Sequence, residues 1–304
     1  MKKSPSLFVR KTLISIIIVL VVAAMIGCKF LPYTIGTYIF DIFLLSIVMI
    51  GAFEMCNIME NVNKPTNKIL AFIYPIFNYV VLLIALKFNK IYYVWLTEIA
   101  CIIIYFLVVL LTELVTSKNT FKQKAKTSLN TLLACLYPSF MFASFLIINH
   151  CDVYFDIKNI SVVFILLIIA ITFLTDTFAY IVGSLLHGPK LAPKISPNKT
   201  ISGAIGGLIG GVAGAMLVYA LVYNVPSFSA LLTNFNISWW GFLIIGVVGA
   251  IVGQAGDLFE SFLKRKAQIK DTSHILGSHG GMLDRVDAMT FNVVFMLIVV
   301  IILL

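Results

Sequence analysis

Long apolar runs constrain what this chain can fold into more than any other feature of its sequence. Crossing the hydrocarbon layer of a membrane takes about 20 apolar residues in a helix. Runs close to that length contain few charged side chains and are joined by short loops; they cover residues 12–28, 36–56, 69–87, 91–113, 129–149, 160–183, 201–222, 240–262 and 286–304. The runs predict an all-α, polytopic transmembrane helical protein with about nine spans.

Composition argues against a soluble domain. Hydrophobic residues make up 61% and charged residues 12% of the 304 residues, whereas a soluble domain carries roughly twice that charged fraction. One soluble core of this length could not bury so much apolar surface, but lipid can cover it directly. The first run follows a basic tail and ends in Met25-Ile26-Gly27-Cys28, which faintly resembles a lipoprotein signal. Because methionine fits that motif poorly and further spans follow, we expect an uncleaved first span.

The remaining charged residues are distributed unevenly along the chain. The N-terminal tail and every second loop are rich in Lys and Arg, whereas the stretch between Tyr223 and Trp239 has no charged residue. This bias predicts a cytoplasmic N-terminus and an external C-terminus. The formal charge of +9 therefore indicates contact with the lipid bilayer and no nucleic-acid partner, which would need an exposed basic face. We expect a multi-pass protein of a bacterial plasma membrane, with its active site on the cytoplasmic side.

Glycine content divides the chain into two predicted domains. Residues 1–150 hold five bulky N-terminal transmembrane helices, and residues 151–304 hold the catalytic helices 6–9 with their cytoplasmic loops. In the second part, glycines recur at four-residue spacing as Gly203, Gly207, Gly211 and as Gly206, Gly210, Gly214. Such stripes let helix backbones approach closely. They are consistent with internal packing and equally with a homodimer.

The densest charged segment lies at the end of run 240–262 and in the loop after it, where carboxylates alternate with Lys and Arg. A segment that only anchored topology would need Lys and Arg alone. Asp257, Asp284 and Asp287 are hard oxygen ligands suited to Mg²⁺, and a second cation would be compatible with so many acids. Gly280 and Gly281 leave backbone N–H groups open to an anion. Metal ions and fixed cations together are what phosphoryl or nucleotidyl transfer requires.

A second polar cluster is predicted on the same side of the membrane. Asp176 lies near the end of run 160–183, and Ser196, Lys199 and Thr200 lie just before run 201–222. A helix N-terminus with one Lys and one hydroxyl makes a reasonable phosphate site. Alone this signal is weak, because the same residues also make a good helix start, and Asp176 could equally be a lone buried acid.

At these residues the sequence resembles the phosphatidate cytidylyltransferase family, also called CDP-diacylglycerol synthases. The resemblance covers the run from Ser261 through Lys264-Arg265, Lys270-Asp271, His279-Gly280-Gly281 and Asp284-Arg285-Val286-Asp287. The segments around Asp176 and from Ser196 to Thr200 match more weakly. Two positions depart from the family pattern, with Ser202 where the family usually has Glu and Phe178 where it usually has Gly.

The resemblance implies a CTP-dependent nucleotidyltransferase of phospholipid biosynthesis. Its substrates would be CTP and phosphatidic acid, its products CDP-diacylglycerol and pyrophosphate, and its cofactor Mg²⁺. Asp257 and Asp284 would hold the metal, with Asp287 in support. The basic residues that would bind the triphosphate and the leaving pyrophosphate are Lys264, Arg265, Lys270 and Arg285. The remaining substrate contacts would be Ser196, Lys199, Thr200, Ser261, Asp271, His279, Gly280, Gly281 and Asp176.

Other functions remain open from sequence. The nearest are a CTP-dependent polyprenol kinase and a cytidylyltransferase for another lipid phosphate. A transporter of a phosphorylated lipid is a different class, in which acids and bases would line a pathway. The charges instead gather in the loops of one membrane side, which favours the enzyme.

Overall fold

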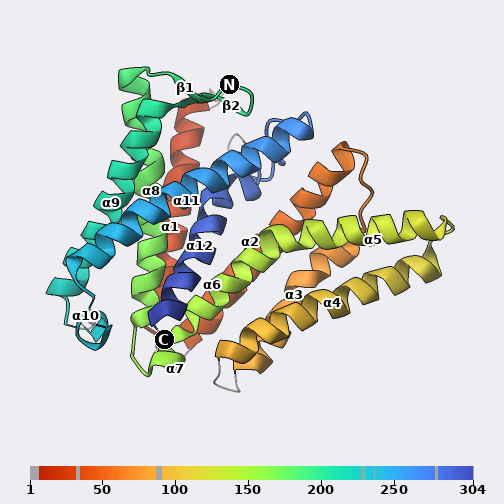
Figure 1. Cartoon of the computed structure of the whole chain (residues 1–304), viewed down its shortest axis with the longest axis horizontal. Helices are drawn as coiled ribbons and strands as arrows, with labels where there is room; N and C mark the ends of the chain where they lie inside the picture. Colours follow the sequence, from red (N-terminus) through yellow and green to blue (C-terminus); the bar gives the residue numbers. More distant parts are fainter. Residues whose placement is uncertain are drawn as a thin grey trace, which may run out of the picture. The chain divides into compact units, whose positions relative to one another are not determined.

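The computed structural model describes residues 7–31, 35–86, 91–226, 228, 230–235, 237–277 and 280–303. Eight of the helices in these ranges are long and apolar enough to cross a membrane. The remaining predicted span, the first run at 12–28, is contained in the 22-residue helix α1 (Leu7–Cys28). The predicted all-α, multi-pass fold with about nine spans is therefore confirmed (Figure 1).

The helices group into two compact units, each of which combines separate parts of the chain. The first unit comprises Met1–Ala143 and Lys266–Arg285, and the second comprises Ser144–Arg265 and Val286–Leu304. By packing, the loop 266–285 thus belongs with the N-terminal helices. The sequence analysis divided the chain at residue 150 into N-terminal helices and catalytic helices. That division stays a prediction.

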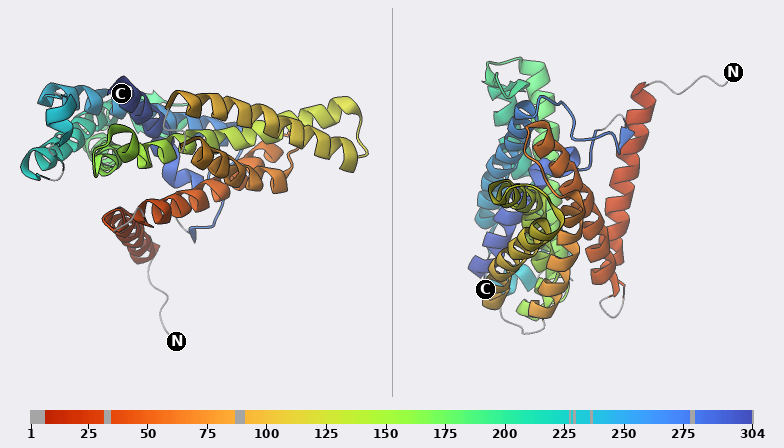
Figure 2. Two further views of the ribbon diagram at one scale, coloured as in Figure 1. Left: turned by 90° about the horizontal axis from the view of Figure 1, so that it is seen from below. Right: turned by 90° about the vertical axis from the view of Figure 1, so that its right-hand side faces the viewer.

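The first unit is built from α1 and four further long helices, and it includes the start of α6. The bounds are α2 (Ile35–Asn61), α3 (Lys68–Leu86), α4 (Ile91–Thr116), α5 (Phe121–Cys135), the π-helical turn η1 (Leu136–Phe140) and α6 (Met141–Asn149). Helices α4 and α5 lie side by side (Figure 2). The buried residues of helix α2 include the carboxylates Asp41 and Glu54. Tyr79 of α3 donates a hydrogen bond to Asp41, 3.1 Å between oxygens.

The fifth span begins earlier than the apolar run indicates. Helix α5 starts at Phe121, eight residues before the predicted start at 129, because Thr120 and Gln123 form a capping box. The Gln123 carboxamide oxygen accepts a hydrogen bond from the Thr120 N–H at 3.0 Å, which satisfies a backbone donor that a helix start leaves open. The span then kinks within η1, where Tyr137 has a non-helical φ of −103° and ψ of 114° just before Pro138, and α6 follows the kink.

The second unit is a bundle of long helices with short helices in two of its loops. The bounds are α7 (Cys151–Phe155), α8 (Ile160–Leu186), α9 (Ile201–Asn224), α10 (Ala230–Phe235), α11 (Trp239–Lys266) and α12 (Leu283–Leu303), of which α12 begins in the first unit. Helices α8 and α9 lie against each other along their length (Figure 1). A Cβ atom on Gly211 would come within 2.6 Å of Ala250 in α11 and 2.8 Å of Thr175 in α8. The glycine stripes therefore allow α9 to pack closely against both neighbours.

A β-hairpin, which was not predicted from the sequence, joins α8 to α9. Strand β1 (Lys190–Ala192) pairs antiparallel with β2 (Ser196–Thr200). The hairpin gives the segment from Ser196 to Thr200 a fixed backbone path into the first turn of α9.

Candidate active site

A pocket of about 430 Å³ lies between α8, α9, α11 and the hairpin. Its wall carries two carboxylates, Asp176 from α8 and Asp257 from α11, and the ammonium group of Lys199 from β2. Lys199 and Asp257 form an ion pair, and their side chains are 27% and 29% exposed. The structure therefore brings together the two polar segments that the sequence analysis identified separately.

The first turn of α9 holds Lys199 in place. Thr200 is the N-cap of α9, and its hydroxyl accepts a hydrogen bond from the Gly203 N–H at 3.0 Å. The Ser202 hydroxyl accepts from the Gly188 N–H at 3.2 Å and so connects α9 to the end of α8. Lys199 thus sits beside the positive end of a helix dipole, where an anion is stabilised. Ser196 begins β2, half-buried, and is not among the described residues that line the pocket.

The last turns of α11 carry three further predicted residues. The Lys264 ammonium group lies 3.0 Å from the Glu260 carboxylate, and Glu260 is completely buried. Ser261 is half-buried beside this pair. The exposed Arg265 donates from Nε to the Ile195 carbonyl oxygen at 3.2 Å and thereby holds the tip of the hairpin. In this structure Arg265 therefore has a role in positioning the hairpin, in addition to its predicted phosphate contact.

The acids of the second unit fit a metal ion only if the substrate completes its coordination. Asp287 of α12 lies close enough to Asp257, Asp176 and Lys264 for their charges to act on it. Across the described part of the chain, no three acidic, His or Cys side chains converge into a group that could hold an ion by themselves. Mg²⁺ usually takes one or two carboxylates together with waters and substrate phosphates. The arrangement therefore suits a metal that binds with a nucleotide.

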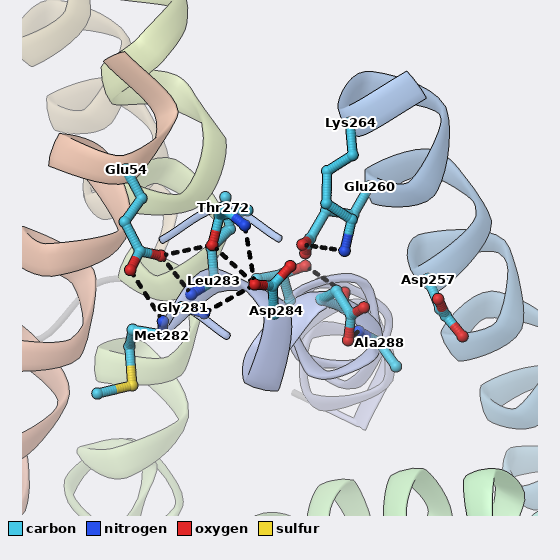
Figure 3. Close-up of polar contacts among 12 residues, drawn as sticks. Glu54, Asp257, Glu260, Lys264, Thr272, Gly281, Met282, Leu283, Asp284 and Ala288 are labelled. Carbon is cyan, nitrogen blue, oxygen red and sulfur yellow. Dashed lines mark hydrogen bonds and ion pairs between the residues drawn. The ribbon is translucent and has the colours of Figure 1, made fainter. Parts of the chain in front are cut away.

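In the first unit, Asp284 closes the loop that precedes α12. Its Oδ2 atom accepts hydrogen bonds from the Thr272 N–H at 2.9 Å, from the Thr272 hydroxyl at 3.0 Å and from the Gly281 N–H at 2.8 Å (Figure 3). Asp284 lies in the first turn of α12, where a carboxylate also interacts favourably with the helix dipole. The carboxylate thus has a structural role as well as its predicted metal role.

The structure corrects one expectation about Gly280 and Gly281. Their N–H groups are not open to an anion, because Gly281 donates to Asp284 and Gly280 donates to the Gly277 carbonyl oxygen at 3.4 Å. Glycine is needed here for other reasons. Gly280 has a φ of +81°, and a Cβ atom on Gly281 would overlap the Thr272 hydroxyl.

Three predicted residues of this region, Lys270, Asp271 and Arg285, are exposed. His279 lies outside the described residues.

Sequence analysis missed Glu54 of α2. Its carboxylate is completely buried and accepts hydrogen bonds from the loop that carries the family-like run (Figure 3). The signal was available, because an ionisable residue inside an apolar span is costly and so indicates function.

A family model and individual relatives both show similarity between this chain and cytidylyltransferases. The sequence model of the cytidylyltransferase family matches residues 11–303. A phosphatidate cytidylyltransferase of Staphylococcus saprophyticus is 32% identical over 159 residues, which cover 50% of this chain and 57% of that relative. A phosphatidate cytidylyltransferase of Bacillus subtilis is 33% identical over 195 residues, which cover 64% of this chain and 65% of the relative. In both cases the match spans less than two thirds of the relative's length.

Proposed function

The chain belongs to the cytidylyltransferase family, and we propose that it is a phosphatidate cytidylyltransferase. It would transfer CMP from CTP to phosphatidic acid and release CDP-diacylglycerol and pyrophosphate. The observation that carries the proposal is the pocket in which Lys199, Asp257 and Asp176 meet at the N-terminus of α9. The names of the two bacterial relatives support the choice of lipid and nucleotide.

The chemistry follows from the charges in the pocket. An oxygen of the phosphatidate phosphate attacks the α-phosphorus of CTP, a new P–O bond forms, and the bond to the bridging oxygen of the β-phosphate breaks. The attacking oxygen is already anionic, so the reaction needs no strong general base. Its main requirement is to neutralise charge on the phosphate oxygens and to align the reacting groups. Lys199 and the α9 dipole would supply part of that neutralisation.

Dependence on a divalent cation is general in the cytidylyltransferase family. We propose that the ion is Mg²⁺, held by Asp257 with support from Asp287 and completed by phosphate oxygens of CTP. When bound, it would stabilise the charge on the triphosphate. The predicted metal role of Asp284 and the phosphate roles of Lys264, Lys270 and Arg285 are part of the same proposal.

The chain is a multi-pass membrane protein with bacterial relatives. We place its active site on the cytoplasmic side, because the hairpin beside the pocket carries Lys190, Lys194 and Lys199 and positive loops are retained on that side. A homodimer remains a prediction.

Two labelled forms of CTP distinguish this function from its alternatives. Purified protein in detergent is incubated with phosphatidic acid, Mg²⁺ and CTP labelled at either the α- or the γ-phosphate, and the lipid phase is counted. Cytidylyl transfer puts the α label into lipid, and chelation of the metal with EDTA abolishes that transfer. A CTP-dependent kinase would put the γ label into an added polyprenol instead. Absence of both labels from lipid would refute an enzymatic role in CTP use and favour the transporter.

A further inference from the structure

Both oxygens of the Glu54 carboxylate accept hydrogen bonds from one loop, the segment that precedes α12. Oε1 accepts hydrogen bonds from the Ser273 hydroxyl and from the Met282 N–H, the latter at 3.0 Å. Oε2 accepts from the Thr272 hydroxyl at 3.0 Å and from the Leu283 N–H at 2.8 Å (Figure 3). An ionised carboxylate has about four lone-pair sites, so these donors match its capacity. The loop therefore places four donor groups around a single buried acid.

The same loop connects Glu54 to Asp284. The Thr272 hydroxyl lies 3.0 Å from Glu54 Oε2 and 3.0 Å from Asp284 Oδ2, so its one hydrogen serves two carboxylates. The Thr272 and Gly281 N–H groups donate to Asp284. Both ends of segment 272–283 are thus tied to a pair of acids, one from α2 and one from the start of α12.

Gly281 permits this close approach. A Cβ atom at Gly281 would lie 2.6 Å from Glu54 Oε1 and 2.7 Å from Glu54 Oε2. Any other residue would push the loop away from the carboxylate. Gly281 and Glu54 therefore pack directly against each other, although they lie in distant parts of the sequence.

We infer that Glu54 is a positioning residue: it holds residues 272–273 and 281–283, on the two described sides of the loop, in place and thereby orients Asp284 for the reaction. A buried carboxylate in a membrane helix is expensive unless it is fully hydrogen-bonded. Four donors offset that cost and couple α2 to the loop. The effect on turnover rests on the proposed function, whereas the restraint on the loop does not.

Glu54→Gln tests the inference with little change in shape. Either orientation of the amide sets its NH₂ group against one hydroxyl, which can rotate, and one backbone N–H, which cannot. We expect amide hydrogen exchange at Met282 and Leu283 to rise by about tenfold or more in the full-length protein, with exchange elsewhere in α2 and α12 unchanged. Since misplacement by about 1 Å can cost 10²-fold in rate, kcat should fall by about 10–100-fold, with the KM for CTP changed much less.

Glu60→Gln is the matched control. Glu60 lies on the same helix, but its side chain is 37% exposed and pairs with Lys68 at 2.8 Å, so both measurements should stay at wild-type values. If Glu54→Gln does not fold, Thr272→Val removes only the bridging hydroxyl, while Thr272→Ser keeps it. Thr272→Val should show the faster exchange and slower turnover, and Thr272→Ser should restore both.

The two measurements separate the possible failures. Unchanged exchange at Met282 and Leu283 in a folded Glu54→Gln protein would refute the restraint on the loop. Faster exchange with an unchanged kcat would refute the positioning role. A wild-type protein that transfers no CMP would refute the proposed function alone, because exchange would still report whether Glu54 holds the loop.

Discussion

Gly210→Ala should separate α8 from α9 and destabilise the second unit. A Cβ atom at Gly210 would lie 2.7 Å from Phe178 Cβ and 2.8 Å from the Leu174 carbonyl carbon, and it would also press on the Leu174 carbonyl oxygen. Carbon atoms in contact prefer about 3.5–4.0 Å, so the helices must move apart by about 1 Å. The obstacle includes backbone, which cannot rotate away as a side-chain tip can.

The size of the effect follows from two opposing contributions. Overpacking costs about 1–3 kcal/mol, and a backbone obstacle places this site at the upper end. Alanine recovers about 1 kcal/mol through its higher helix propensity. The expected net loss is about 2 kcal/mol in the free energy of unfolding, or a fall in Tm of about 4–8 °C.

Gly207→Ala provides a matched control in the same helix. There the nearest atom to a new Cβ is Gln254 Nε2 at 2.9 Å, the end of a flexible side chain that can move. Its Tm should stay within about 2 °C of wild type. Thermal unfolding of both variants in detergent, followed by circular dichroism, measures the difference. Equal Tm values for the two variants would refute the close backbone contact between α8 and α9.

Three further predictions concern the site and the topology. Asp257→Asn and Asp284→Asn should each abolish CMP transfer in a protein that still folds. An amide is a poor Mg²⁺ ligand, and loss of the carboxylate ligand costs several kcal/mol of transition-state stabilisation. Near-normal activity in either variant at ordinary Mg²⁺ would exclude the metal role of that residue. Ser202→Ala should retain most activity because it loses a hydroxyl worth about 1 kcal/mol, whereas Lys199→Ala should lose most of it; the reverse order would exclude a phosphate site at this turn. A reporter active only in the cytoplasm should give no signal when fused after Leu304, and a strong signal there would indicate an even number of crossings.

The sequence predicted which charged residues the pocket contains, but it did not predict the elements that hold them in place. The charge pattern placed both polar segments on the same side of the membrane, and only the structure shows that Lys199 and Asp257 form an ion pair. The β-hairpin was missed because its strands are short and Pro197 in β2 is a weak strand signal. Glu54 was missed because it lies in a long apolar run, where the average hydrophobicity masks one acid.

The amino-acid sequence by itself determined the membrane-spanning helices, their approximate limits and the segments that carry charge. These are local properties: about 20 apolar residues suffice for a span, and a short run of charged residues can be read without its surroundings. Only the tertiary structure decided that Glu54 holds the loop before α12, since the hydrogen bond from Thr272 to Glu54 joins residues 218 positions apart. It also showed that the N–H group of Gly281 donates a hydrogen bond to Asp284. A donor's partner depends on which groups folding brings within hydrogen-bond distance, and residue spacing along the chain does not contain that information.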